Sequence, residues 1–245
     1  MPFTFSHPAI ILPLKYFPRK WFSLTGLVIG SLTPDFEYFI RMKVQSIYSH
    51  TLDGIFWFDL PLGILLTFIF HNIVRNSLYL NLPSFFKSRL LLFTEFNWNT
   101  YFKENYTTVI VSLIIGITSH LFWDAFTHNH GYFVNKIPTL SNTATILKNE
   151  IPLWKIAQHL SSLLGAFAIV IAILRLPKKL NSKTSVSKKY WVTILILLIL
   201  ILVLRFSISF NLKAFGNIIV SIISAFLISL ISTSLLIKSK GGSKF

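Results

Sequence analysis

The segment SHLFWDAFTHNHG, residues 119–131, carries the side chains best suited to chemistry in this chain. His120, Asp124 and His128 follow at intervals of four residues, so on a helix they lie along one face. Zinc accepts imidazole nitrogen and carboxylate oxygen, often with one position left for water. The spacing therefore predicts a site for a divalent metal, most simply zinc, in which these side chains reach one ion or bridge two. The alternative is a row of polar residues at a membrane interface.

Three other segments offer further ligands. The stretch GSLTPDFEYF contributes Asp35 and Glu37 behind Pro34, which fixes the local backbone. YSHTLDG contributes His50, and SHP near the N-terminus contributes His7. Each segment also has a simpler interpretation, because the acids can pair with the basic residues that follow them, and YSHTLDG can cap a helix.

The composition predicts an all-α polytopic membrane protein with five to six transmembrane helices. Of the 245 residues, 53% are hydrophobic and only 13% are charged, whereas a soluble domain carries about 25% charged residues. Several apolar runs approach the roughly 20 residues that cross a bilayer. The absence of cysteine excludes disulfides and thiolate metal sites.

The net charge of +15 indicates contact with lipid rather than with nucleic acid. Most basic residues lie in short segments beside apolar runs, where lysine and arginine set the topology. The same residues can contact anionic headgroups. We therefore expect membrane lipid as a partner and no nucleic acid.

Five runs are predicted to span the membrane, and a sixth run at residues 21–40 is apolar at first but ends in acids. The five predicted spans are 55–74, 107–126, 156–174, a run from Tyr190, and 215–237. Residues 1–175 contain every chemical motif and are predicted to form one membrane domain. Residues 190–237 contain no histidine or acid and are predicted to form a C-terminal transmembrane hairpin.

The basic loops predict the orientation. Residues 175–189 contain six lysines and arginines and no acid, so this loop is expected in the cytoplasm. His50, Asp124 and His128 then lie at the opposite, non-cytoplasmic face. Six spans improve the charge bias, whereas Asp35 favours a shallow or re-entrant helix, and this choice stays open.

Five motifs occur in an order that resembles an uncharacterised bacterial membrane protein family. They are MPFTFSHPA, GSLTPDFEYF, SHTLDGIFWFDLPLG, SHLFWDAFTHNHG and QHLSSLLG, and they cover residues 1 to about 175. The opening motif and the WDAFTH block are the most specific parts. This resemblance implies a membrane protein with no activity that can be transferred.

A more distant pattern is similar to the YdjM-like membrane-bound metal-dependent hydrolases and to zinc-dependent phospholipase C. It implies a bacterial inner-membrane location and six metal ligands, with His130 as a substitute for the last of them. The six ligands would be His7, Asp35, His50, His120, Asp124 and His128. The phospholipase pattern continues with His-x-x-x-Glu, where this chain has Gln158 and Ser162. One or two ions are therefore expected rather than three.

The leading hypothesis is a metal-dependent hydrolase of a phosphoester or lipid-like substrate at the membrane face. Glu37 is the spare carboxylate nearest these motifs in sequence and is the candidate base. The alternative is a non-catalytic membrane protein with a structural polar or ion-binding cluster, and a transporter ranks third. No G-x-S-x-G elbow and no phosphate-binding glycine loop is present in the sequence.

Overall fold

The computed structural model describes residues 4–18, 20–178, 186–208 and 214–241, and these residues are mostly helical. Five helices within the described residues are long and apolar enough to cross a membrane, which confirms the predicted fold class. They are Ile55–Asn81, Trp98–Lys136, Leu153–Leu174, Lys188–Ile208 and Phe215–Ile237. The first two extend well beyond the predicted runs, because polar residues continue the helices past their apolar parts.

Residues 21–40 do not form a further long helix. They form α2 (Leu24–Leu32), the 3-10 turn η3 (Thr33–Asp35) and α3 (Phe36–Arg41). The nine residues of α2 extend about 14 Å at 1.5 Å per residue, about half of a 30 Å hydrocarbon core. Pro34 lies in the turn that separates the two helices and ends the apolar run.

The chain divides into two compact units. The first comprises residues 1–35, 47–64 and 105–172, and it contains all six predicted metal ligands. The second comprises residues 36–46, 65–104 and 173–245. One boundary lies inside the helix α7 (Trp98–Thr127), at Asn105, whose φ of −131° and ψ of 28° are not helical.

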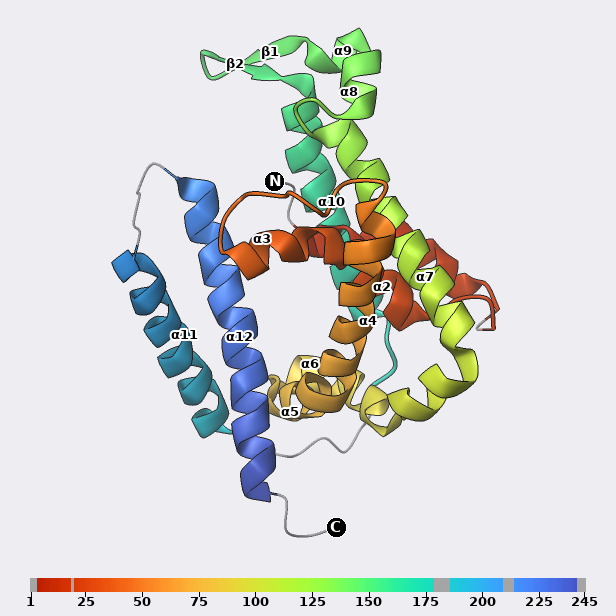
Figure 1. The fold of residues 1–245 in the computed structure, drawn as a ribbon, viewed down its shortest axis with the longest axis vertical. Helices are drawn as coiled ribbons and strands as arrows, with labels where there is room; N and C mark the ends of the chain where they lie inside the picture. Colours follow the sequence, from red (N-terminus) through yellow and green to blue (C-terminus); the bar gives the residue numbers. More distant parts are fainter. Residues whose placement is uncertain (1–3, 19, 179–185, 209–213, 242–245) are drawn as a thin grey trace. The chain divides into compact units, whose positions relative to one another are not determined.

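The first unit combines long helices with short turns (Figure 1). Its other elements are η1 (Thr4–Ser6), α1 (Pro8–Ile11), η2 (Leu12–Tyr16), the π-helical turn η4 (Ile55–Asp59), the start of α4 (Leu60–Ile69), α8 (Tyr132–Lys136), α9 (Pro138–Ser141), β1 (Thr143–Ile146), β2 (Asn149–Pro152) and α10 (Leu153–Leu174). The strands pair antiparallel, with Thr143 opposite Pro152. This small hairpin lies beyond the ends of α7 and α10 and is the one departure from an all-helical chain among the described residues.

Glycines allow α2 and α7 to approach at backbone distance. A Cβ added at Gly30 would overlap the carbonyl oxygen of Leu113, and one added at Gly116 would overlap that of Leu27. Ser23 caps α2 by accepting from the Gly26 amide at 3.2 Å. This tight contact fixes α2, and the turn η3 that follows it, against the helix that carries the predicted metal ligands.

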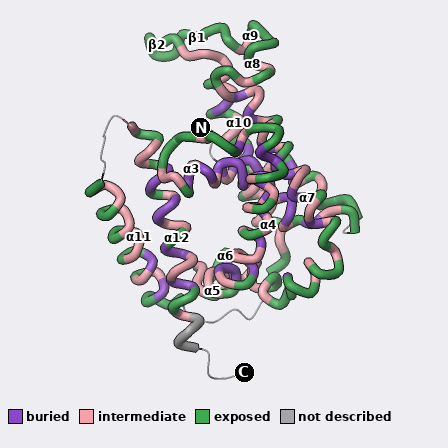
Figure 2. The backbone as a smooth tube through the Cα atoms, viewed as in Figure 1, coloured by how far each residue is buried: buried purple, intermediate pink, exposed green. Residues whose placement is uncertain are grey.

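The second unit is held together by α12 (Phe215–Gly241) and α11 (Lys188–Ile208). Its remaining elements are α3, the π-helical turn η5 (Phe70–Val74), α5 (Arg75–Asn81), α6 (Ser84–Leu90) and η6 (Leu91–Glu95). The hydroxyl of Ser224 donates to the carbonyl oxygen of Phe39 at 2.6 Å, which fastens α12 to α3. Most of α11 is exposed (Figure 2), as expected of a helix that faces lipid.

Candidate metal centre

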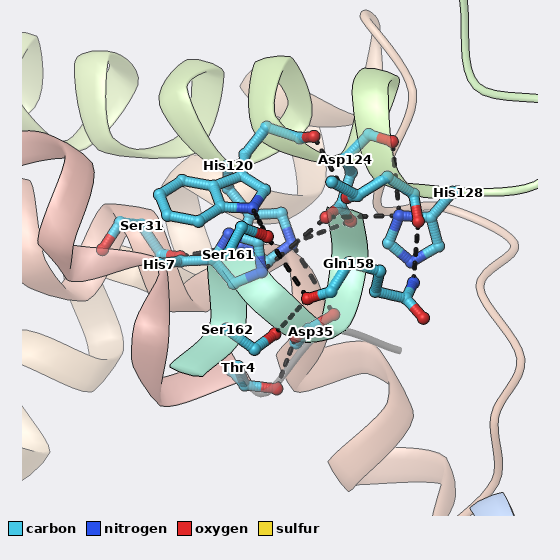
Figure 3. A network of polar contacts seen from close by, with 12 residues as sticks. Thr4, His7, Ser31, Asp35, His120, Asp124, His128, Gln158, Ser161 and Ser162 are labelled. Carbon is cyan, nitrogen blue, oxygen red and sulfur yellow. Dashed lines mark hydrogen bonds and ion pairs between the residues drawn. The ribbon is translucent and has the colours of Figure 1, made fainter. Parts of the chain in front are cut away.

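The first unit brings all six predicted ligands into one polar network, and Figure 3 labels His7, Asp35, His120, Asp124 and His128. His7 lies between η1 and α1, Asp35 ends η3, and His50 lies in the loop before η4. His120 and Asp124 lie one turn apart on α7, and His128 directly follows its last residue, with its amide still bonded to the Asp124 carbonyl oxygen at 3.0 Å. The network therefore joins segments that are separated by more than a hundred residues in sequence.

Ligand atoms of His50, His120 and Asp124 all lie within 4.8 Å of one another, as do ligand atoms of His7, Asp35 and His120. The Nε2 atoms of His50 and His120 lie 3.5 and 3.4 Å from Asp124 Oδ2. Both nitrogens lie 3.6 Å from Asp35 Oδ1. These distances are long for hydrogen bonds, but ligands about 2.1 Å from a tetrahedral zinc ion are about 3.4 Å apart. The donor set and its spacing therefore fit a divalent ion.

The second oxygen of Asp124 faces a different pair of imidazoles. Its Oδ1 lies 3.7 Å from His7 Nε2 and 3.3 Å from His128 Nδ1. The two oxygens of one carboxylate thus point to separate nitrogen pairs. This is the arrangement of a carboxylate that can bridge two ions, although His128 Nδ1 also lies 3.3 Å from the Asp124 carbonyl oxygen.

Several of these buried atoms have no hydrogen-bond partner among the described residues. They are both ring nitrogens of His7, Nε2 of His120 and Oδ1 of Asp124. Buried polar atoms are almost always satisfied by protein, water or an ion. The rings of His7 and His120 also stack at 3.8 Å. Bound cations would satisfy His7 Nε2, His120 Nε2 and Asp124 Oδ1, which supports the fit to a metal.

Supporting contacts fix the orientation of the inner ligands. The Nδ1 of His120 lies 2.8 Å from the Ser31 carbonyl oxygen, to which it can only donate, so Nε2 keeps its lone pair for the cluster. The Thr4 hydroxyl donates to Asp35 Oδ2, which leaves Oδ1 facing the imidazoles. Ser49 Oγ lies 3.0 Å from His50 Nδ1. Such outer partners hold metal ligands in the required tautomer and direction.

The loop residue His50 has a left-handed backbone, with φ of 62°. This conformation is uncommon for a residue with a side chain and is found most often at functional sites. Here it directs the imidazole between Asp35 and Asp124. The positive φ costs backbone free energy, and the surrounding loop must hold His50 in this conformation to place the ligand.

Helix α10 positions His7 without ligating. The Ser6 hydroxyl donates to the carbonyl oxygen of Ser162 at 2.7 Å, and a Cβ at Gly165 would lie 2.9 Å from Ser6. Gln158 donates to the Thr127 carbonyl oxygen at 2.8 Å. Gln158 and Ser162 thus act as supports rather than as ligands.

The electrostatics outside the spans are dominated by burial and by the two carboxylates. Burial opposes the protonated form of His50, but the contacts with Asp124 and Asp35 outweigh it and raise its pKa to about 9. Burial also favours the neutral form of Asp35, yet the neighbouring imidazoles of His120 and His50 lower its pKa. For His7, burial and then the nearby His120 lower the pKa to about 3. At neutral pH the metal-free protein therefore has a neutral His7 and a protonated His50, so binding of a metal ion must release the proton of His50.

The cluster is closed on one side and open on the other. The side chains of His120 and Asp35 are 0% and 3% exposed, whereas those of His50 and His128 are 19% and 30% exposed. The accessible part of the cluster is therefore the outer edge of these two rings, whereas the ligand atom His50 Nε2 is itself buried. A purely structural ion would normally be enclosed on all sides.

Glu37, the candidate base, belongs to the second unit. It is buried, and its carboxylate accepts from Arg41 Nε at 2.8 Å and from the Ser46 hydroxyl at 3.3 Å. These contacts agree with the alternative in which the acid pairs with a following basic residue. Its role as a base stays a prediction. His130 is exposed, with φ of 65°.

The sequence patterns did not indicate two residues that support metal ligands and one buried acid. Thr4 and Ser31 support Asp35 and His120, and nothing in their type or spacing indicates this. Asp59 is fully buried in the π-helical turn η4 of the first span. An acid within an apolar run is a recognisable signal, since ionisable residues inside membrane helices are usually functional.

Comparison with known families identifies the family of this chain. A family model described as a domain of unknown function (DUF4184) matches residues 1–235. The chain belongs to the DUF4184 family. The prediction of an uncharacterised family is thus confirmed, and the match continues well past residue 175. No curated protein and no solved structure matches this DUF4184 chain.

The Thr4 hydroxyl gives a direct test of the supporting contacts. Replacing Thr4 by valine keeps the shape but removes the donor to Asp35 Oδ2. We expect metal affinity to fall about 10-fold or more, as for other outer partners of metal ligands. Titration against a chromogenic chelator measures this change. Thr4→Ser restores the donor and should bind like wild type, and equal affinities for all three proteins would contradict the assigned role.

Proposed function

We propose that this chain is a membrane-embedded, metal-dependent hydrolase that acts on a phosphoester or lipid-like substrate at the non-cytoplasmic membrane face. The observation that carries the proposal is the cluster of six His and Asp side chains with ligand-like spacing, two of which, His50 and His128, are partly exposed. The proposal also draws on the order of the sequence motifs, which resembles that of membrane-bound metal-dependent hydrolases and zinc-dependent phospholipase C; the comparisons with known proteins do not show this resemblance. Zinc is the proposed metal, because the donors are imidazole and carboxylate.

The residues have distinct roles in this scheme. A divalent ion at the site supplies Lewis acidity and a water of lowered pKa. His120, Asp35 and His50 hold the inner position, and Asp124 joins it to the outer pair, His7 and His128. His128 borders the open side, where a phosphoryl group can approach, and Glu37 stays the proposed base.

A second candidate has its own supporting observation. The cluster joins η1, η3, the loop before η4 and α7, so an ion bound there could have a purely structural role and hold these segments together. In this case the chain is a non-catalytic membrane protein, and the C-terminal segment 190–237 is its anchoring hairpin. The two candidates predict different effects on turnover when an outer ligand such as His128 is removed.

The test combines metal content with hydrolysis. Wild-type protein in detergent is analysed by mass spectrometry for zinc and manganese, and then assayed with bis-p-nitrophenyl phosphate and a fluorogenic phospholipid. We expect bound metal and turnover in wild type, and about a 100-fold loss of turnover in folded His128→Ala. The exposed His130→Ala serves as the matched control. Bound metal without turnover on either substrate would favour the structural role. No bound metal after reconstitution would contradict both the hydrolase and the structural ion site.

A further inference from the structure

A groove of about 330 Å³ lies between the hairpin β1–β2 and α10, outside the metal centre. Its lining is formed by Ile146, Ile151, Ile156, His159, Leu160 and Leu163. All of these belong to the first unit, and His159 alone among them has a polar side-chain group. Its size falls at the lower end of small-ligand sites, which are about 300–1,000 Å³.

Helix α10 separates the groove from the metal centre. Gln158 is buried and bonds to the end of α7, whereas His159 lies about 100° further around the helix and is exposed in the groove. The groove and the cluster therefore lie at the same end of α10 but on different faces. A ligand in the groove would not occupy the cluster.

The groove opens onto a surface that faces lipid. The span Leu153–Leu174 includes the helical part of its lining. Leu163, Leu164 and Phe167 are 69%, 59% and 64% exposed along the same helix. An apolar face of this length on a membrane-crossing helix contacts acyl chains. The apolar groove is therefore continuous with the lipid-facing surface.

The hairpin itself carries a signal for the membrane interface. Its tip is formed by Leu147 and Lys148, both with positive φ, where Asn-Gly is the usual choice. Leu147 is 90% exposed, so in water an apolar side chain would occupy both a strained and a solvated position. Contact with the bilayer surface gives this leucine an apolar environment and keeps the lysine beside the headgroups.

We propose that the groove binds one acyl chain of a membrane phospholipid, with the imidazole of His159 toward the headgroup. An amphiphile fits better than a partner helix, because the lining is apolar apart from one hydrogen-bonding group at the surface. The groove's continuity with the lipid-facing side of α10 gives the chain its route of entry. This proposal does not depend on whether the metal centre is catalytic.

The test is photolabelling of the full chain reconstituted into phosphatidylcholine vesicles. The vesicles contain a trace of phosphatidylcholine with a diazirine on one acyl chain, and labelled peptides are identified by mass spectrometry. We expect adducts on residues 146–163 at least fivefold above those on the exposed leucines of α11. Leu163→Trp, which fills the groove, should remove this excess, whereas Leu164→Trp on the neighbouring exposed face should retain it.

A variant in the other wall keeps the test decisive if Leu163→Trp does not fold. Ile151→Trp fills the groove from the hairpin, and it should also remove the excess labelling. Labelling of the groove no stronger than that of α11 would overturn the proposal. So would equal labelling of folded groove-filling and control variants, or a dimer whose interface excludes the lipid from the groove.

Discussion

Asp124→Asn is expected to abolish metal binding while the helices remain folded. Asp124 is the one carboxylate whose two oxygens each lie near two imidazoles, those of His50 and His120 on one side and of His7 and His128 on the other. Asparagine keeps the size but removes the charge and replaces one oxygen by a donor. Loss of an outer partner alone costs 10–100-fold in metal affinity, so we expect a loss of about 100-fold or more.

The measurement is metal content by mass spectrometry after dialysis against zinc, with circular dichroism to report the fold. Asp53→Asn is the matched control, because Asp53 is an exposed carboxylate just after His50 in the sequence. Its metal content should equal that of wild type. Stoichiometric zinc in folded Asp124→Asn would contradict the bridging role and would leave the ligands as a network of protonated pairs.

Gly116→Ala is expected to destabilise the protein and to weaken metal binding with it. The new Cβ would overlap the Leu27 carbonyl and would lie 2.7 Å from the Ser31 amide nitrogen, so α2 must move away from α7. Overpacking against backbone costs about 2–3 kcal/mol, more than the roughly 1 kcal/mol that alanine gains in a helix. Because the Ser31 carbonyl fixes His120, the displaced α2 also releases a ligand.

Thermal unfolding in detergent, with and without zinc, measures both effects. The net cost lowers the Tm by roughly 2–8 °C for a chain of this size. Gly63→Ala is the control, since it has the same helix propensity gain but meets only the side-chain atoms Leu113 Cδ2 at 3.0 Å and Thr33 Oγ1 at 3.3 Å. Equal Tm values for both variants would show that α2 and α7 are not in backbone contact.

Local signals predicted the fold and half of the candidate site. Hydropathy predicts the five long helices, because each span must satisfy its own backbone hydrogen bonds in lipid. The four-residue spacing of His120, Asp124 and His128 predicts one helix face, which the structure shows. In both cases the information lies within one turn or one span, so a single sequence suffices.

The other half of the candidate site depends on contacts between segments that are distant in the sequence. His7 joins the cluster through the contact of Ser6 with Ser162, 156 residues away, and no local pattern indicates this pairing. Residues 21–40 read as one apolar run, but they form two short helices around Pro34. Glu37 lies two residues after Asp35 and belongs to the other unit. Its (i, i+4) pairing with Arg41 is a local signal.

The docking of Ser6 on α10 also has a consequence for biosynthesis. Ser6 and His7 leave the ribosome long before Ser162, whose carbonyl oxygen accepts from the Ser6 hydroxyl. The centre is therefore completed only after α10 has been made and inserted. Until then His7 has only its contacts with α7, such as the stacking on His120, and the support from the third long helix is added last.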